Sequence, residues 1–159
     1  VYSGFRGTPQ SETVRSIGVQ DAVAAAGGFL PEGNILECQF QMESGFLQAQ
    51  ELLQRAPDLD TVICATDTIA VGALQYIKSV GKKVPDDIQI AGIGDSTLTR
   101  VTEPLLTTVH LHFEEAGTQA ARLLVELIQN GKDAAHKEVK LDSRLIVQES
   151  TRTGGTEFL

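Results

Sequence analysis

Apolar and polar positions along the chain follow two alternating periods. Short apolar runs, which predict strands, occupy residues 1–5, 34–40, 61–65, 88–93 and 106–109. Longer segments with an apolar residue every three or four positions, which predict helices, occupy residues 11–26, 44–56, 67–80 and 113–130. Repeated strand–helix units predict an α/β fold with a right-handed parallel sheet.

Glycine and proline mark the ends of the predicted helices. Gly27 and Gly81 each follow the last apolar residue of a helical segment, and Pro57 follows another. The run 61–65 is apolar throughout, which is typical of a strand buried on both faces of a parallel sheet. Near the end of the chain, residues 139–141 and 145–147 predict a closing pair of strands, and residues 153–156 predict a loose tail.

The composition is that of a soluble globular domain with an acidic surface. The chain has 159 residues, of which 42% are hydrophobic and 21% charged, and its net charge is −8. An acidic chain lacks the electrostatic footprint for binding nucleic acid by itself. No apolar run approaches the ~20 residues that span a bilayer, and no secretion signal opens the chain. We therefore expect a cytoplasmic location, with Cys38 and Cys64 reduced and buried.

Three sequence blocks are the most informative about the fold and the position of a ligand site. These blocks are residues 65–73 (ATDTIAVGA), 81–88 (GKKVPDDI) and 106–109 (LTTV). Together they predict a strand, a helix that ends at a glycine, a proline-marked loop and another strand, an arrangement that puts polar groups at the carboxyl edge of a parallel sheet. The charged residues of block 81–88 are themselves expected to be solvated loop residues without a ligand role. In this order and spacing the blocks resemble the effector-binding domain of the LacI/GalR family of sugar-responsive transcription regulators.

The resemblance implies a parallel-sheet fold of the type I periplasmic-binding-protein class, of which this chain holds mainly the C-terminal lobe. Residues 1–152 would form that part, with a segment of about 103–130 crossing toward the other lobe, and residues 153–159 would be a tail. The implied role is binding, in a repressor, of a small sugar effector between two lobes. The resemblance also implies a homodimer that reaches operator DNA only through an N-terminal helix-turn-helix outside this chain. It implies no enzyme activity, cofactor, metal or membrane.

Thr66 and Asp67 stand where a buried strand ends and a helix begins. One interpretation is structural, because a threonine hydroxyl can cap a helix and an acidic residue favours the helix dipole. The other interpretation is that both residues face a cleft and bind ligand hydroxyls. The family usually carries Asn at the position of Thr66. Threonine there resembles the trehalose- and sucrose-responsive members and indicates a disaccharide or its phosphate.

Arg15 and Phe40 are further candidates for contact with the ligand. Arg15 lies in an Arg-x-x-Gly pattern like that of the family, and a planar guanidinium can hold two ligand oxygens. Without the resemblance it would be an ordinary solvated helix arginine. Phe40 precedes a Glu-Ser-Gly-aromatic block that also matches the family, so stacking on the ligand and packing in the core are both open.

Gly94 and Asp95 follow the fourth predicted strand, and here the chain departs from the family. Members commonly carry an acidic or amide residue at the position of Gly94 to hold ligand hydroxyls. Either Asp95 substitutes for that residue, or the glycine leaves room for a bulkier ligand. The resemblance also places Leu111 and Phe113 in the cleft near the crossing between lobes.

Other chemistry is less well supported by the sequence. Ser96, in a Gly-Asp-Ser-Thr-Leu block, resembles the nucleophile of the GDSL hydrolases, which would need a histidine base oriented by a carboxylate. His110 and His112 can share one face of a strand, but a metal would need further ligands. Arg6 is a candidate for binding an anionic group. A periplasmic-type sugar-binding protein, which shares the two-lobed architecture, is the other alternative.

Overall fold

The computed structural model describes residues 3–4, 9–130 and 137–152, with side chains from residues 16–129 and 137–152. The elements in chain order are β1 (Ser3–Gly4), α1 (Pro9–Ala25), β2 (Leu36–Glu37), α2 (Met42–Arg55), β3 (Thr61–Ile63), α3 (Asp67–Ser79), β4 (Gln89–Ile93), β5 (Thr107–Leu111), α4 (Phe113–Asn130) and β6 (Ser143–Ile146). Short 3₁₀ helices occupy Glu32–Asn34 and Thr97–Arg100. The α/β alternation predicted from the sequence is confirmed. The predicted tail at residues 153–159 lies outside the described residues.

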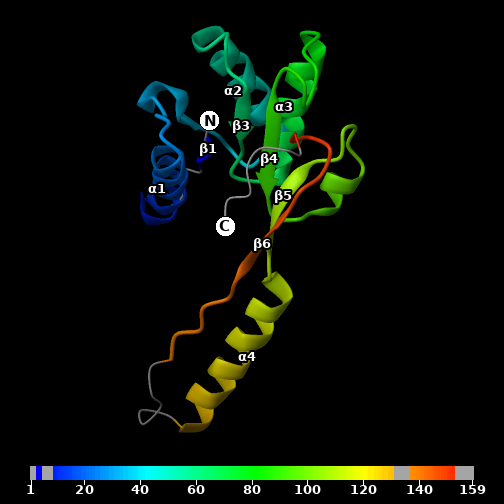
Figure 1. The fold of residues 1–159 in the computed structure, drawn as a ribbon. Helices are drawn as coiled ribbons and strands as arrows, with labels where there is room; N and C mark the ends of the chain where they lie inside the picture. Colours follow the sequence, from blue (N-terminus) through cyan, green and yellow to red (C-terminus); the bar gives the residue numbers. More distant parts are fainter. Residues whose placement is uncertain (1–2, 5–8, 131–136, 153–159) are drawn as a thin grey trace.

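The larger sheet has the strand order β3-β4-β5-β6. Its first three strands are parallel, and β6 runs antiparallel to β5. β1 and β2 form a separate parallel pair beside α1 (Figure 1). The predicted closing pair of strands is wrong: residues 139–141 form no strand, and 143–146 pair with β5 instead. The chain leaves the sheet after β5 to form α4, and on its return β6 runs alongside β5. The strand edge to which β6 bonds is therefore that of β5 and not residues 139–141.

The core lies where α2 and α3 pack on each other and on the sheet. Ile69, Ala73 and Ile77 of α3 are buried together with Val62 of β3 and Ile90 of β4. This burial explains the helical spacing of apolar residues in α3 and the apolar run in β3. The helix ends at Ser79, just before Gly81, the residue that marks its end in the sequence. The φ of Gly81 is +79°, a left-handed conformation that glycine adopts without strain.

Two glycines allow α2 and α3 to approach very closely. A Cβ atom at Gly72 of α3 would collide with the backbone of Met42, and one at Gly45 of α2 would collide with the backbone of Ile69. At each glycine, the backbone of the other helix therefore packs directly against the glycine backbone. This contact fixes the distance between the two helices.

Ser150 closes the amino end of the sheet between β4 and β5. Its hydroxyl donates to Ile90 O at 2.6 Å and accepts from Thr107 N at 2.8 Å. Its backbone adds bonds from Ile90 N to Ser150 O and from Ser150 N to Leu105 O. Ser150 is fully buried, so these four bonds satisfy groups that water does not reach.

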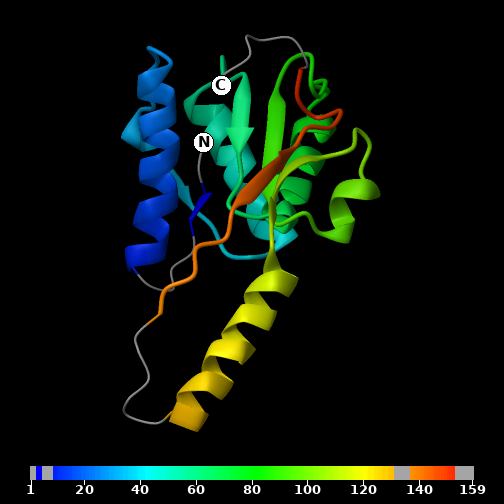
Figure 2. The ribbon, with the colours of Figure 1, turned by 60° about the horizontal axis from the view of Figure 1, so that its bottom comes forward.

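α4 extends away from the sheet, as both ribbon views show (Figures 1 and 2). Several of its apolar side chains are exposed, among them Phe113 at 63% and Ile128 at 73%. No helix among the described residues has the length and apolar character needed to cross a membrane.

Candidate functional site

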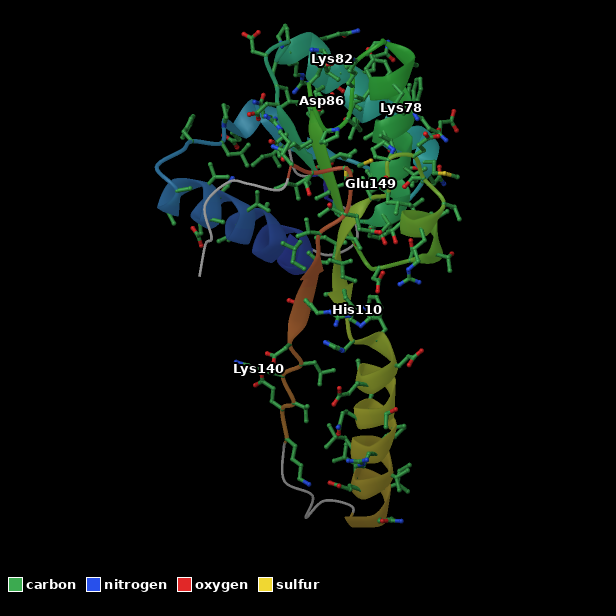
Figure 3. The ribbon with its side chains drawn as sticks, turned by 45° about the vertical axis from the view of Figure 1, so that its right-hand side comes forward. Lys78, Lys82, Asp86, His110, Lys140 and Glu149 are labelled. Carbon is green, nitrogen blue, oxygen red and sulfur yellow. The ribbon has the colours of Figure 1, made fainter. Side chains whose placement is uncertain are left out.

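The carboxyl ends of β3, β4 and β5 meet at one edge of the sheet, near the point where the chain departs toward α4. Thr66 and Asp67 follow β3, Asp95 follows β4, and His110 lies near the end of β5. Figure 3 shows His110 at this end, remote from Lys78 and Glu149 at the opposite end of the sheet. The edge predicted from the sequence therefore exists and carries polar side chains from three strands.

The Asp67 carboxylate holds this edge together from the inside by hydrogen bonds. Its side chain is buried, with the residue only 2% exposed. One carboxylate oxygen accepts from the Thr108 hydroxyl at 2.6 Å, and the other accepts from Ser96 N at 2.7 Å. A Cβ atom at Gly92 would collide with this carboxylate, so the glycine leaves the space that it occupies. Asp67 thus joins the segments that follow β3 and β4 to Thr108 in β5, and each of its carboxylate oxygens has a protein partner.

Asp95 forms a second, adjoining group of polar contacts. Its backbone N–H donates to Thr108 Oγ1 at 3.2 Å. The same hydroxyl donates to Asp67, so Thr108 connects the two aspartates. One carboxylate oxygen lies 3.0 Å from Arg100 Nη2, and the other lies 2.8 Å from His110 Nδ1. The Asp95 backbone has a φ of +51°, a left-handed conformation that aspartate tolerates better than most residues.

Strand alternation decides which residues of β5 face these carboxylates. Thr108 and His110 are two apart and point to the same face, where they reach Asp67 and Asp95. Leu111 belongs to the opposite face of the strand. The His112 ring follows His110 and lies edge-on to it, with ring centroids 4.7 Å apart. His112 lies just after the end of β5, so the two rings are in contact although the strand itself does not include both residues.

Thr66 caps α3, as the structural interpretation predicts. Its hydroxyl accepts from Ile69 N at 3.4 Å, a long bond that leaves most of the hydroxyl's capacity free for other donors. The cap and a ligand contact are compatible, because a hydroxyl has two acceptor lone pairs and one donor. Contact with a ligand stays a prediction.

The remaining candidates lie elsewhere. Phe40 is 45% exposed and lines a hollow of about 780 Å³ between β2 and α2, together with Cys38 and Ser44. Among the described residues, this hollow shares no lining residue with the Asp67 and Asp95 contacts. Arg15 lies in α1, with its side chain outside the described part, and Arg6 lies outside the described residues altogether. Phe113 is the exposed first residue of α4.

Sequence reasoning passed over Thr108, Arg100 and the pairing of His110 with Asp95. Thr108 lies 41 residues from Asp67, and His110 lies 15 from Asp95, so no local pattern joins them. The one available signal is the Thr-x-His alternation in a strand that ends at the ligand-binding edge. That alternation predicts a shared face but not its neighbours.

The hydrolase alternative finds no support in the geometry of Ser96. Its buried hydroxyl has no hydrogen-bond partner within the described part of the chain, so no base is bonded to it. The described residues also contain no group of three or more side chains suited to a metal ion.

Cys38 and Cys64 are both buried, as expected. Burial raises the pKa of the Cys64 thiol to about 12, because a thiolate would lose its hydration. A thiol in that state is a small apolar core group rather than a nucleophile.

Comparison with known proteins extends the likeness along the chain. Residues 1–151 match the family model of the periplasmic binding protein-like domain. The transcriptional regulator CelR of Thermobifida fusca is 36% identical over 133 residues, which are 84% of this chain and 39% of CelR. The regulator MalR of Streptomyces coelicolor is 32% identical over 139 residues, 87% of this chain and 40% of MalR. The chain thus spans about two fifths of the length of these relatives.

Solved structures give the same architecture. A structure of CelR in complex with cellobiose superposes with a TM-score of 0.85 and 33% identity, over 94% of this chain and 46% of that one. The regulator CcpA of Lactococcus lactis superposes with a TM-score of 0.83 and 29% identity, over 95% of this chain and 55% of that one. These relatives are transcription regulators rather than enzymes.

Proposed function

This chain belongs to the periplasmic binding protein-like domain family, in the form that LacI-family transcriptional regulators carry, and from this we propose that it binds a small sugar effector for such a regulator. The sugar would lie at the carboxyl edge of β3, β4 and β5. The observation that carries the proposal is the superposition, over nearly the whole chain, on CelR bound to cellobiose. A disaccharide or its phosphate is the effector class that Thr66 favours.

The second lobe of the proposed cleft would come from outside this chain. On this proposal, residues 1–152 are the C-terminal part of the effector domain, and a segment of about 103–130 crosses to the other lobe. The direction of α4, away from the sheet, supports this arrangement (Figure 2). So do its exposed apolar side chains, which a second lobe would cover.

The proposed mechanism is a shift between two lobe arrangements. A sugar shifts that equilibrium only through its different affinity for the two states. In a homodimer the shift would change how two helix-turn-helix heads meet operator DNA. The acidic net charge of −8 agrees with DNA contact through those heads and not through this domain. A cytoplasmic location and a repressor role belong to the same proposal.

Each candidate residue has a role in this proposal that its chemistry supports. Arg15 would hold two ligand oxygens with its guanidinium. Thr66 would bind a hydroxyl with the capacity that its long capping bond leaves unused. Phe40 and Phe113 would offer apolar surface to the sugar ring, and Leu111 would line the crossing between lobes. Asp67 and Asp95 would hold the edge in shape, since their oxygens have protein partners.

The test is a thermal-shift panel on the intact protein that carries this chain. The panel contains cellobiose, sucrose, trehalose, the 6-phosphates of sucrose and trehalose, and common monosaccharides. A sugar at ~100 times its dissociation constant should stabilise the folded state by roughly 2.7 kcal/mol. A response to one member identifies the effector class, and no response to any member contradicts the proposal.

Variants then locate the site. Arg15→Ala and Thr66→Ala should abolish the response to the active sugar. Thr66→Ser is the matched control, because it keeps both the cap and the hydroxyl and should keep the response. Unchanged affinity in Arg15→Ala and Thr66→Ala would remove these residues from the site.

A further inference from the structure

The His110 imidazole is fixed at one nitrogen and open at the other. Nδ1 lies 2.8 Å from Asp95 Oδ2, and a carboxylate paired with a guanidinium only accepts, so Nδ1 carries the proton and donates. Nε2 has no hydrogen-bond partner among the residues that the structure describes, and the side chain is 30% exposed. We propose that Nε2 of His110 binds a hydroxyl group of the sugar effector. This inference rests on the proposed function.

Asp95 holds the ring in one orientation. Its side chain is only 8% exposed, its second oxygen is paired with Arg100, and its backbone is bonded to Thr108. A ring fixed in this way has already lost the rotational freedom that binding would otherwise remove. Asp95 is therefore a positioning residue for the imidazole, whatever contact its own remaining lone pairs make with the ligand.

The position of the ring suits a ligand at the carboxyl edge. His110 lies near the point where β5 leaves the sheet (Figure 3) and shares a strand face with Thr108. Gly94, beside Asp95, contributes no side chain to this edge, and its φ of +136° disfavours one. A Cβ atom at Gly94 would lie 3.3 Å from Asp67 Oδ2, so the glycine also leaves room for the buried carboxylate.

A sugar hydroxyl fits Nε2 in either protonation state of the ring. A neutral ring with its proton on Nδ1 accepts a hydrogen bond at Nε2, and a protonated ring donates one. A hydroxyl group can donate or accept, so it is complementary to both forms.

The test separates the two nitrogens of the ring. In His110→Asn the amide nitrogen stands near the place of Nδ1 and can keep the bond to Asp95, but the group at Nε2 is lost. In His110→Gln the amide nitrogen reaches the place of Nε2. We would titrate the intact protein and both variants with cellobiose, sucrose and trehalose, with His112→Asn as the control that removes the neighbouring ring and leaves the Asp95–His110 bond.

We expect His110→Asn to weaken binding of the active sugar by about tenfold. His110→Gln and His112→Asn should stay within about threefold of the unsubstituted protein. In imidazole ¹⁵N spectra, the sugar should shift the Nε2 signal of His110 more than its Nδ1 signal. Unchanged affinity in His110→Asn, or equal losses in the Asn and Gln variants together with lower melting temperatures, would overturn the inference. If the unsubstituted protein binds none of the sugars, the proposed function itself fails, and this inference fails with it.

Discussion

Asp67 shows how one buried carboxylate can organise a ligand-binding edge. It gathers a backbone N–H from the loop after β4 and a hydroxyl from β5. Both donors lie at positions where water has little access, so they depend on this acceptor. Asp67 therefore shapes the edge from the inside.

Replacing Asp67 should reduce stability more than its size suggests. In Asp67→Ala, Ser96 N and the Thr108 hydroxyl lose their acceptor, and we expect the free energy of unfolding to fall by about 3 kcal/mol. Urea denaturation measures this change. Asp58→Ala, at an exposed position, is the control and should stay within about 0.5 kcal/mol. If the two substitutions lower the free energy of unfolding equally, the hydrogen bonds of Asp67 do not hold this edge together.

Cys64 should make stability depend on alkaline pH. Burial raises the pKa of its thiol from an ordinary 9.0 to about 12, so above pH 9 the unfolded chain ionises while the folded one does not. The stabilising contribution is complete below pH 9 and is lost as the pH rises toward 12. Between pH 8 and 10 the unfolding free energy should fall by about 1.4 kcal/mol more than in Cys64→Ala. Parallel pH curves for the two proteins would mean that the thiol is accessible to water.

Single residues could be predicted from the sequence where their partners are near in the chain. The Thr66 cap is of this kind, because its partner is Ile69 N, three residues away. The buried state of Cys64 followed from its apolar run. The pairing of Asp95 with His110 could not be predicted, since it depends on β4 lying beside β5 and on the β5 residue that faces the loop after β4. The register of β4 and β5 cannot be predicted from a single sequence.

At the scale of elements, the contact between α2 and α3 is the most demanding feature. The two glycines that face it leave no room for a side chain. Gly72→Ala should push α2 away and lower the free energy of unfolding by about 3 kcal/mol or more.

A second glycine substitution is the control for this contact. A Cβ atom at Gly18, within α1, would meet no atom within 4 Å. Gly18→Ala should therefore leave the free energy of unfolding unchanged or raise it by about 0.5–1 kcal/mol, because alanine favours the helix. Thermal unfolding compares the two variants, and a tolerated Gly72→Ala would disprove the close contact.

The helices could be predicted well because their ends have chemical marks. Pro57 follows α2 and Gly81 follows α3, and the observed ends lie within two residues of these marks. Strand partners have no such marks. β6 was expected to pair with residues 139–141, and it pairs with β5 because that edge is free when the chain returns from α4. The 3₁₀ turn at Thr97–Arg100, which carries Arg100 to Asp95, gave no signal in the apolar pattern.

For the whole molecule, α4 is the feature that a single lobe does not explain. It extends away from the sheet (Figure 1). Its described apolar side chains at Phe113, Leu124, Val125, Leu127 and Ile128 are exposed. In the intact protein we expect Ile128→Asp to lower the free energy of unfolding by roughly 2–3 kcal/mol, because the second lobe would bury that side chain. Gln129→Asp, one position along on an exposed polar site, is the control. If the two variants unfold alike, α4 faces water and the two-lobe proposal loses its main structural support.

The bonds of Ser150 also constrain how the domain can be made. The backbone N–H and the backbone carbonyl of Ile90 both bond to Ser150, which is 60 positions later in the chain. A ribosome therefore releases β4 and β5 well before the residue that closes the gap between them. Until residue 150 has left the exit tunnel, the backbone groups of Ile90 and Thr107 have to bond to water or to a chaperone surface. The hydrogen bonds that join β4 to β5 at this end of the sheet can therefore be completed only after residue 150 has been made, however early the strands themselves appear.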